Sequence, residues 1–182
     1  MATFVRKTKW REQVMTIRLA RIDDRLIHGQ VATAWTKATG IERIIVVGDE
    51  VARDPFRKVL LNEAAPPGIR TNVVSIEQLL RVCTHYLFMQ QQIMLLFTNP
   101  QDVVRLVQGG MFIHSVNIGG MRFQAGKHMV TNFVSIDEKD RQAFYYLNHR
   151  GIELELRKVP ADRKVNLMDL LEKEKNVANK NV

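Results

Sequence analysis

The chain has 182 residues, 46% of them apolar, and a formal net charge of +8. This length predicts one domain, or at most two, with a sizeable core. The single cysteine, Cys83, excludes an intramolecular disulfide, and no apolar run approaches the roughly 18 residues that span a bilayer. The basic residues near the N-terminus are not followed by the apolar segment of a secretory signal, so we expect a cytoplasmic protein.

The positive charge suggests nucleic acid as a partner, but its distribution argues against this. Residues 1–14 contain four basic residues and one acidic residue, and they show no helical or strand period. We interpret them as a flexible extension. The remaining charges are scattered, without a basic block or interleaved aromatic residues that would stack on bases. Anionic substrates, phosphoryl groups or acidic protein surfaces explain the same balance, and we expect no nucleic acid partner.

Apolar segments of strand and helix period alternate along the chain. This alternation predicts a single-domain α/β fold, an open and mostly parallel sheet with helices on both faces. The segment 152–156 alternates polar and apolar residues, which is typical of a strand at a sheet edge. The predicted strands are 16–22, 43–48, 71–75, 93–97, 114–118, a short strand within 128–134, and 152–156; the predicted helices are 31–39, 54–65, 76–86, 100–108, 138–150 and 166–172, before a polar tail, 173–182.

The first predicted strand ends in a turn that is rich in ionisable side chains. An imidazole, two guanidinium groups and two carboxylates lie within eight residues, namely His28, Arg21, Arg25, Asp23 and Asp24. A polar turn that leads from a strand into a helix is where open α/β sheets place their ligand sites. We therefore expect the functional site at this turn.

His28 is the candidate nucleophile, because histidine forms covalent intermediates and its pKa is near neutral. Arg25 can offer two parallel N–H donors to a phosphoryl group, while Arg21 either binds the same anion or faces solvent. Gly29 leaves the flank of the histidine open. Gly29 and Gln30 also come immediately before the predicted helix, whose unpaired N–H groups favour an anion.

The two carboxylates of the turn have different predicted roles. Asp23 is expected to orient Arg25 or the imidazole, and Asp24 suits a turn or cap position. An acid/base pair or a metal site would also use carboxylates, but only these two cluster. The other histidines show no metal-ligand spacing with each other or with Cys83, so we predict neither a metal nor a cofactor.

Further candidates follow the neighbouring strands. Thr98 comes after the fourth predicted strand, and Gly119 and Gly120 come after the fifth. In a doubly wound sheet, the loops after neighbouring strands line one edge. Their hydroxyl and N–H groups would complete an anion cradle around the histidine. For the two glycines, simple turn geometry is an equally good interpretation.

The run from Arg21 to Val31 resembles the active-site motif of phosphotransferase system (PTS) IIB components of the mannose/fructose/sorbose family. The resemblance includes 64–68, 96–100, 117–121 and 126–127, and it covers roughly residues 15–171. It implies a seven-stranded sheet, with residues 15–172 as the IIB domain. It also implies the activity of a protein-N(pi)-phosphohistidine–sugar phosphotransferase, with His28 as the phosphohistidine and no cofactor.

The resemblance implies partners as well. The histidine would take a phosphoryl group from a IIA component and pass it to a sugar held by the membrane IIC/IID permease. The protein would then associate transiently with the inner face of the cell membrane, and a homo-oligomer is compatible with this role. Sorbose, fructose and mannose all remain open as the sugar, and either imidazole nitrogen can carry the group.

Three rival functions use similar chemistry. A histidine-type phosphatase or mutase places arginine immediately before its histidine, where this chain has Ile27. A nucleotide-binding module needs a glycine-rich phosphate loop, and neither common pattern of such loops occurs. A receiver-type regulator needs an aspartate after the third strand, where the chain has Ser75.

A carrier also needs an accessible histidine, so we expect a shallow depression around His28, with Leu26 and Ile27 either at its apolar rim or in the core.

Overall fold

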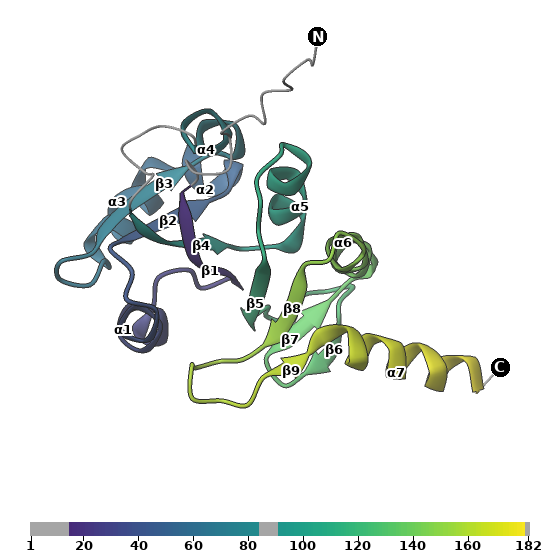
Figure 1. Ribbon diagram of the computed structural model, residues 1–182. Coiled ribbons are helices and arrows are strands. Elements are labelled where there is room, and N and C mark those ends of the chain that lie inside the picture. Colours follow the sequence, from purple (N-terminus) through teal and green to yellow (C-terminus); the bar gives the residue numbers. More distant parts are fainter. Residues whose placement is uncertain (1–14, 84–90, 181–182) are drawn as a thin grey trace, which may run out of the picture.

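The computed structural model describes residues 15–83 and 91–180. Its main element is a seven-stranded sheet with the order β3-β2-β4-β1-β5-β8-β9 (Figure 1). The predicted mostly parallel α/β fold is thus confirmed. The strands of this sheet are β1 (Thr16–Asp23), β2 (Arg43–Val47), β3 (Arg70–Val74), β4 (Gln92–Phe97), β5 (Ser115–Gly120), β8 (Glu153–Leu156) and β9 (Val165–Asn166).

Strand β1, which leads into the turn that carries His28, lies at the centre of the sheet. It pairs in parallel with β4 on one side and with β5 on the other. Its pairing with β5 places Arg21 opposite Asn117. Because all three strands run in the same direction, the loops that follow them meet at one edge of the sheet, as the sequence predicts.

One predicted strand position is wrong. The segment 152–156 forms β8, which pairs with β5 in parallel and with β9 antiparallel, so it is not at the edge. Two residues, Val165 and Asn166, provide the edge strand in its place. The alternation within β8 arises because Glu153 and Glu155 project from one side of the strand, where both bind Lys164 (3.5 and 3.3 Å).

Helices cover both faces of the sheet and create two apolar cores. Residues from the π-helical turn that precedes α1, from α2 and from α3 contribute to one core, and residues from α4, α5, α6 and α7 contribute to the other. The helical segments are a π-helical turn (Val31–Trp35), α1 (Thr36–Thr39), α2 (Asp49–Arg53), α3 (Pro55–Glu63), α4 (Ile76–Val82), α5 (Pro100–Gln108), α6 (Glu138–His149) and α7 (Leu167–Lys180).

Polar side chains begin several of these helices where the sequence predicts a start. Asp54, Ser75, Asn99 and Asp137 each accept a hydrogen bond from the backbone N–H three residues later. Such caps satisfy donors that have no partner within the helix. The first helix ends at Gly40, whose φ of 60° is the left-handed conformation that favours glycine.

The structure also corrects several element boundaries. The helix expected to end at Glu172 continues to Lys180, because residues 173–180 contain neither glycine nor proline. Helix α2 was not predicted, and the strand within 128–134 is a hairpin of β6 (His128–Thr131) and β7 (Val134–Ile136). The predicted extension, 1–14, and the predicted helix end near Tyr86 lie outside the described residues. None of the helices described is long and apolar enough to cross a membrane.

Candidate active site

The candidate site is built on the turn between β1 and the first helix. Strand β1 ends at Asp23, and the chain reverses through Leu26, whose φ is 57°. Helical hydrogen bonding then begins at the carbonyl of His28, which accepts from the N–H of Ala32 (2.8 Å). His28 therefore stands at the start of the helix, next to N–H groups that have no partner within it. Its side chain is 18% exposed, so solvent reaches the ring.

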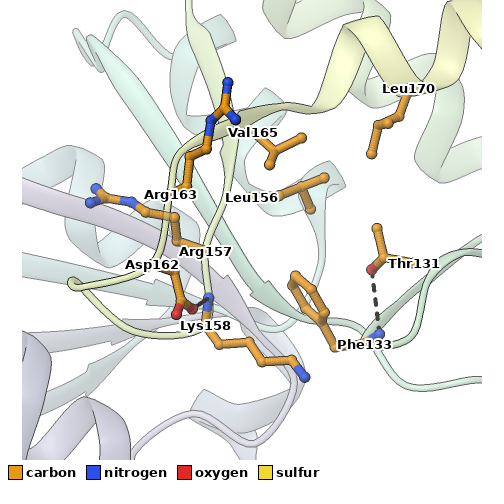
Figure 2. A pocket seen from close by; sticks show the side chains of 9 residues that line it. All are labelled: Thr131, Phe133, Leu156, Arg157, Lys158, Asp162, Arg163, Val165 and Leu170. Carbon is orange, nitrogen blue, oxygen red and sulfur yellow. Dashed lines mark hydrogen bonds between the residues drawn. The ribbon is translucent and has the colours of Figure 1, made fainter.

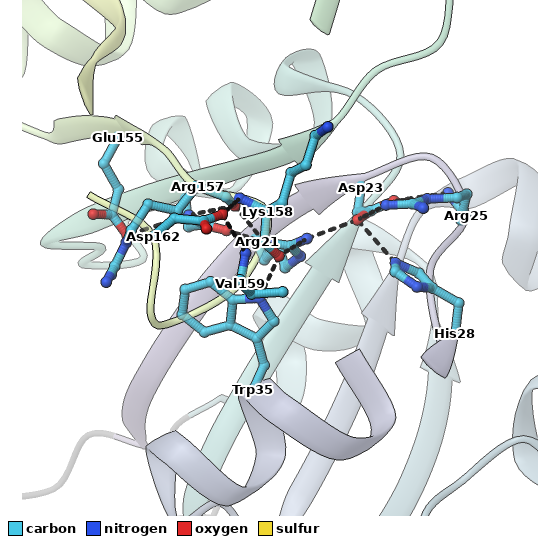
Figure 3. Close-up of polar contacts among 11 residues, drawn as sticks. Arg21, Asp23, Arg25, His28, Trp35, Glu155, Arg157, Lys158, Val159 and Asp162 are labelled. Atoms are coloured by element: carbon cyan, nitrogen blue, oxygen red, sulfur yellow. Dashed lines mark hydrogen bonds and ion pairs between the residues drawn. The ribbon is translucent and has the colours of Figure 1, made fainter. Parts of the chain in front are cut away.

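The carboxylate of Asp23 is the centre of the site (Figure 3). Its Oδ2 lies 3.0 Å from Nε2 of His28 and accepts from Nη2 of Arg21 (2.8 Å) and of Arg25 (3.1 Å). Its Oδ1 accepts from Nε of Arg25 (3.0 Å). The sequence left open whether Asp23 orients Arg25 or the imidazole, and the structure places it against both.

These contacts also decide the charge of Asp23. Burial alone would raise the pKa of its carboxyl group, since Asp23 is fully buried. Hydrogen bonds from Arg25 and His28, together with the charge of Arg21, outweigh burial and lower this pKa below its ordinary value. Asp23 is therefore a carboxylate at neutral pH, and it can hold a proton-bearing Nε2 of the imidazole.

Arg21 lies beneath the turn and does not face solvent. Its side chain is fully buried, and its Nη1 donates to Oδ1 of Asn117 and to the carbonyl of Arg157 (3.1 Å). Its Nη2 donates to Asp23 and to the carbonyl of Lys158 (3.2 Å). The prediction that Arg21 binds an anion directly does not fit this burial. Arg21 instead fixes Asp23 and attaches the loop after β8 to the sheet.

Two further residues complete the enclosure of Arg21. The ring of Trp35, which is itself buried, stacks on the guanidinium of Arg21 at 5.1 Å. A Cβ atom at Gly119 would lie 1.9 Å from Cζ of Arg21. Gly119 is therefore required by the close approach of a buried side chain, which differs from the expected role in an anion cradle.

The opposite side of the turn is open. The side chain of Arg25 is 52% exposed, and its hydrogen bond with Asp23 raises its pKa. Gly29 and Gln30 are exposed, and a Cβ at Gly29 would meet no atom within 4 Å. The open flank expected beside His28 is therefore present.

The apolar rim expected around His28 is not formed by Leu26 and Ile27. These residues are only 1% and 7% exposed, and they pack in the core on the α1 side of the sheet. The left-handed conformation at Leu26 reverses the chain and leaves both side chains beneath the turn. Leu26 and Ile27 therefore anchor the turn to the core, the second of the two positions that the sequence left open for them.

The remaining predicted residues, Asp24, Thr98 and Gly120, contact other parts of the site. Asp24 accepts from the backbone N–H of Arg122 (3.1 Å) and thereby connects the turn to the loop after β5. Thr98 and Asp24 line a polar pocket of about 250 Å³, to which His28 does not contribute. A Cβ at Gly120 would lie 3.2 Å from Oδ1 of Asp23, so Gly120, like Gly119, allows close packing.

The sequence interpretation missed Asn117. Asn117 is 1% exposed, and it connects Arg21 to Glu155. Its Oδ1 accepts from Arg21, and its Nδ2 donates to Oε1 of Glu155 (3.2 Å). A polar amide within the apolar strand that precedes two glycines is a signal that would have found it. In the described part of the chain, no three His, Cys, Asp or Glu side chains are grouped as metal ligands.

A larger pocket of about 380 Å³ lies between the β6–β7 hairpin, the loop after β8 and α7 (Figure 2). Its floor is apolar, with Phe133 and Leu156, and Arg157, Lys158 and Arg163 also line it. None of the residues that the sequence predicts for the site lines this pocket. The candidate active site is therefore the turn that carries His28.

Fold and site together define an α/β domain that presents a histidine, oriented by a buried carboxylate, at the carboxyl edge of a parallel sheet. Residues 17–182 match the model of the PTS system sorbose subfamily IIB component. The chain belongs to this family, which confirms the resemblance found in the sequence.

Individual relatives agree with this assignment. The mannose-specific EIIAB component of Escherichia coli K12 is 59% identical over 159 residues, or 87% of this chain and 49% of that protein, so the chain spans about half the length of this relative. The sorbose-specific EIIB component of Klebsiella pneumoniae is 47% identical over 85% of this chain and 94% of its own. The crystal structure of the IIBSor domain from K. pneumoniae superposes with a TM-score of 0.85, at 46% identity over 87% of this chain and 98% of that chain.

Proposed function

We propose that the chain is the phosphocarrier of a sugar phosphotransferase system. His28 accepts a phosphoryl group from a IIA component and transfers it to a sugar held by a membrane IIC/IID permease. The observation that carries this proposal is the contact between Nε2 of His28 and the buried carboxylate of Asp23 (3.0 Å). A carboxylate that binds one imidazole nitrogen orients the ring and leaves the other nitrogen as the nucleophile.

The same contact supports Nδ1 of His28 as the reacting atom. Nε2 carries the ring proton and donates it in a hydrogen bond to Asp23, so the lone pair of Nδ1 is available for attack. Nδ1 attacks the phosphorus of the donor phosphohistidine, and a new N–P bond forms as the donor's N–P bond breaks. The ring then carries both the phosphoryl group and the Nε2 proton, and it gains positive charge. The carboxylate of Asp23 stabilises this charge, and the steps run in reverse order when a sugar hydroxyl accepts the group.

The exposed residues of the turn supply donors for the phosphoryl oxygens. A guanidinium has five N–H donors, and Arg25 uses two of them for Asp23 through its side chain. Three donors remain for an anion beside His28. The backbone N–H groups of Gly29 and Gln30 lie at the helix start, where they have no partner within the helix. Such preorganised donors stabilise the charge of a transferring phosphoryl group.

The expected partners follow from the relay. The E. coli relative, of which this chain spans about half, is an EIIAB component by name, which supports a IIA protein as the donor. Delivery to a permease requires action at the inner face of the membrane, so we propose a cytoplasmic location with transient membrane association. The sugar is held by the permease, and sorbose, fructose and mannose remain candidates.

Labelling tests the proposal. Incubated with a phosphorylated IIA component, the chain gains the mass of one phosphoryl group, which acid removes. His28→Ala gains none, whereas His149→Ala, a control at an exposed histidine on α6, gains the same mass as the wild type. Acid-labile label that persists in His28→Ala, or acid-stable label on another residue, contradicts the proposal.

A further inference from the structure

The polar pocket of about 250 Å³ is formed at the ends of four neighbouring strands. Asp24 follows β1, Arg57 belongs to the connection after β2, Thr98 follows β4, and Arg122 follows β5. Strands β2 and β4 are neighbours, but the chain leaves them in opposite directions, toward β3 and toward β5. Such a divergence at the carboxyl ends of parallel strands is where open α/β sheets bind ligands.

The pairing of charges within the pocket indicates which groups a ligand would meet. Arg122 is paired with Asp24 (3.3 Å), and Lys127 is paired with Asp140 (2.7 Å). The guanidinium of Arg57, in contrast, has neither a hydrogen bond nor an ion pair with another residue that the structure describes. It is half-buried, and it lines the pocket.

A second donor lies in the same pocket. The hydroxyl oxygen of Thr98 accepts from Nδ2 of Asn99 (3.1 Å), so the hydroxyl proton of Thr98 remains available. An uncommitted guanidinium and an uncommitted hydroxyl donor favour a ligand that accepts hydrogen bonds and carries negative charge. Glu50, the other carboxylate of the lining, opposes such a ligand and provides a test of its charge.

Exposed aromatic side chains are adjacent in sequence to two residues that line the pocket. Phe56, next to Arg57, is 72% exposed, and Phe123, next to Arg122, is 63% exposed. Val59 and Leu60, which lie three and four residues after Phe56 on α3, are 58% and 52% exposed. Apolar side chains around a charged centre are typical of a protein–protein interface.

We propose that an acidic side chain of the docking phosphodonor enters this pocket and pairs with Arg57, while Phe56 and Phe123 contact the donor around it. This inference rests on the proposed function, because the occupant is the protein that phosphorylates His28. The net charge of +8 complements an acidic donor surface. Asp24 belongs both to the pocket and to the turn that carries His28, so an anchor in the pocket fixes the donor relative to the imidazole.

Phosphotransfer kinetics with two matched charge changes test the proposal. Initial rates of transfer from a phosphorylated IIA component are measured against the concentration of this chain, for Arg57→Gln and for Arg53→Gln. Arg53 is an exposed residue at the end of α2 that does not line the pocket, and its replacement removes the same charge. Arg57→Gln raises KM about tenfold at an unchanged maximal rate, and Arg53→Gln has at most a small effect. Equal KM values for the two variants overturn the proposal.

Glu50→Gln determines the sign of the ligand's charge. For a carboxylate in the pocket, removal of the opposing charge of Glu50 lowers KM. A rise in KM with both Glu50→Gln and Arg57→Gln indicates a neutral hydroxyl ligand and rejects the acidic side chain. The amount of label on His28 after long incubation is measured in the same samples. Wild-type chain without label contradicts the proposed function, whereas normal labelling with an unchanged KM for Arg57→Gln contradicts only the role of the pocket.

Discussion

The site has a buried layer and an exposed layer, and they differ in what fixes each residue. Arg21, Asp23 and Asn117 are at most 1% exposed and hold one another through hydrogen bonds. Arg25 and Gly29, one layer above, are exposed, and His28 lies between the layers with its Nε2 on Asp23. The buried layer sets the geometry of the imidazole, and the exposed layer remains open to a partner.

This division has an energetic reason. A buried ion pair adds little net stability, because desolvation offsets the attraction, but removal of one partner leaves a charge unpaired and costs about 3–5 kcal/mol. The pair of Arg21 and Asp23 therefore holds one arrangement rather than strengthening the fold. Exposed charges cost little to keep or to remove, so Arg25 can serve the phosphoryl group without affecting stability.

Two alanine substitutions at glycines compare the layers most directly. A Cβ at Gly119 would overlap the guanidinium of Arg21, which cannot move without losing its bonds to Asp23 and Asn117. We expect Gly119→Ala to lower the free energy of unfolding by at least about 3 kcal/mol. Gly29→Ala meets no neighbouring atom and should change it by no more than about 0.5 kcal/mol. Chemical denaturation measures both values, and equal effects would remove the distinction between the layers.

Asp23→Asn should destabilise the protein by about 3 kcal/mol at pH 7, because it leaves Arg21 buried without its carboxylate. The loss should depend on pH. The pKa of Asp23 is lowered in the folded state, so its stabilisation is present above the ordinary value of 3.8 and disappears as the pH falls through the folded value. Unfolding of wild type and variant from pH 7 to pH 2 tests this, and a difference that grows toward acid pH would refute it.

Arg25→Lys examines the exposed layer. We expect the rate of phosphotransfer to fall about tenfold, since an ammonium group cannot reproduce the paired donors of a guanidinium. Stability should change by no more than about 0.5 kcal/mol, because the side chain of Arg25 is half-exposed. Transfer kinetics and denaturation are measured on the same preparation. Unchanged kinetics would exclude Arg25 from the site.

Ionic strength should affect the exposed layer more than the buried layer, and this is the smallest of the expected effects. Added salt screens exposed charges over about 10 Å at 0.1 M, so transfer from the phosphodonor should slow several-fold between low and moderate salt. The stability difference between wild type and Asp23→Asn should change little, because buried pairs are screened less. A transfer rate independent of salt would contradict electrostatic steering by the exposed layer.

Sequence reasoning predicted the fold well because its signals are local. Apolar runs such as Arg43–Val47, and capping residues such as Asp54 and Asn99, determine strands and helix starts without reference to the rest of the chain. The edge position of 152–156 was wrong because the number of strands beyond it depends on a two-residue pairing, β8 with β9, that leaves no local pattern.

The sequence predicted which residues belong to the site better than it predicted the role of each residue there. His28, Asp23 and Arg25 are close in sequence, so their proximity in space follows from the turn. The roles of Arg21 and Gly119 depend on the register of β1 with β5, which brings residues 98 positions apart into contact. Neither an arginine in a strand nor a pair of glycines reveals that the arginine side chain fills the space left by a glycine.

The central claim is that Asp23 holds Nε2 of His28 and leaves Nδ1 to carry the phosphoryl group. Nuclear magnetic resonance of the ¹⁵N-histidine-labelled chain, phosphorylated by a IIA component, identifies the nitrogen bonded to phosphorus. Phosphorus bonded to Nδ1, with Nε2 protonated, is the result that this geometry predicts. Phosphorus on Nε2 of His28 would contradict it, because that atom would have to leave Asp23 before it could react.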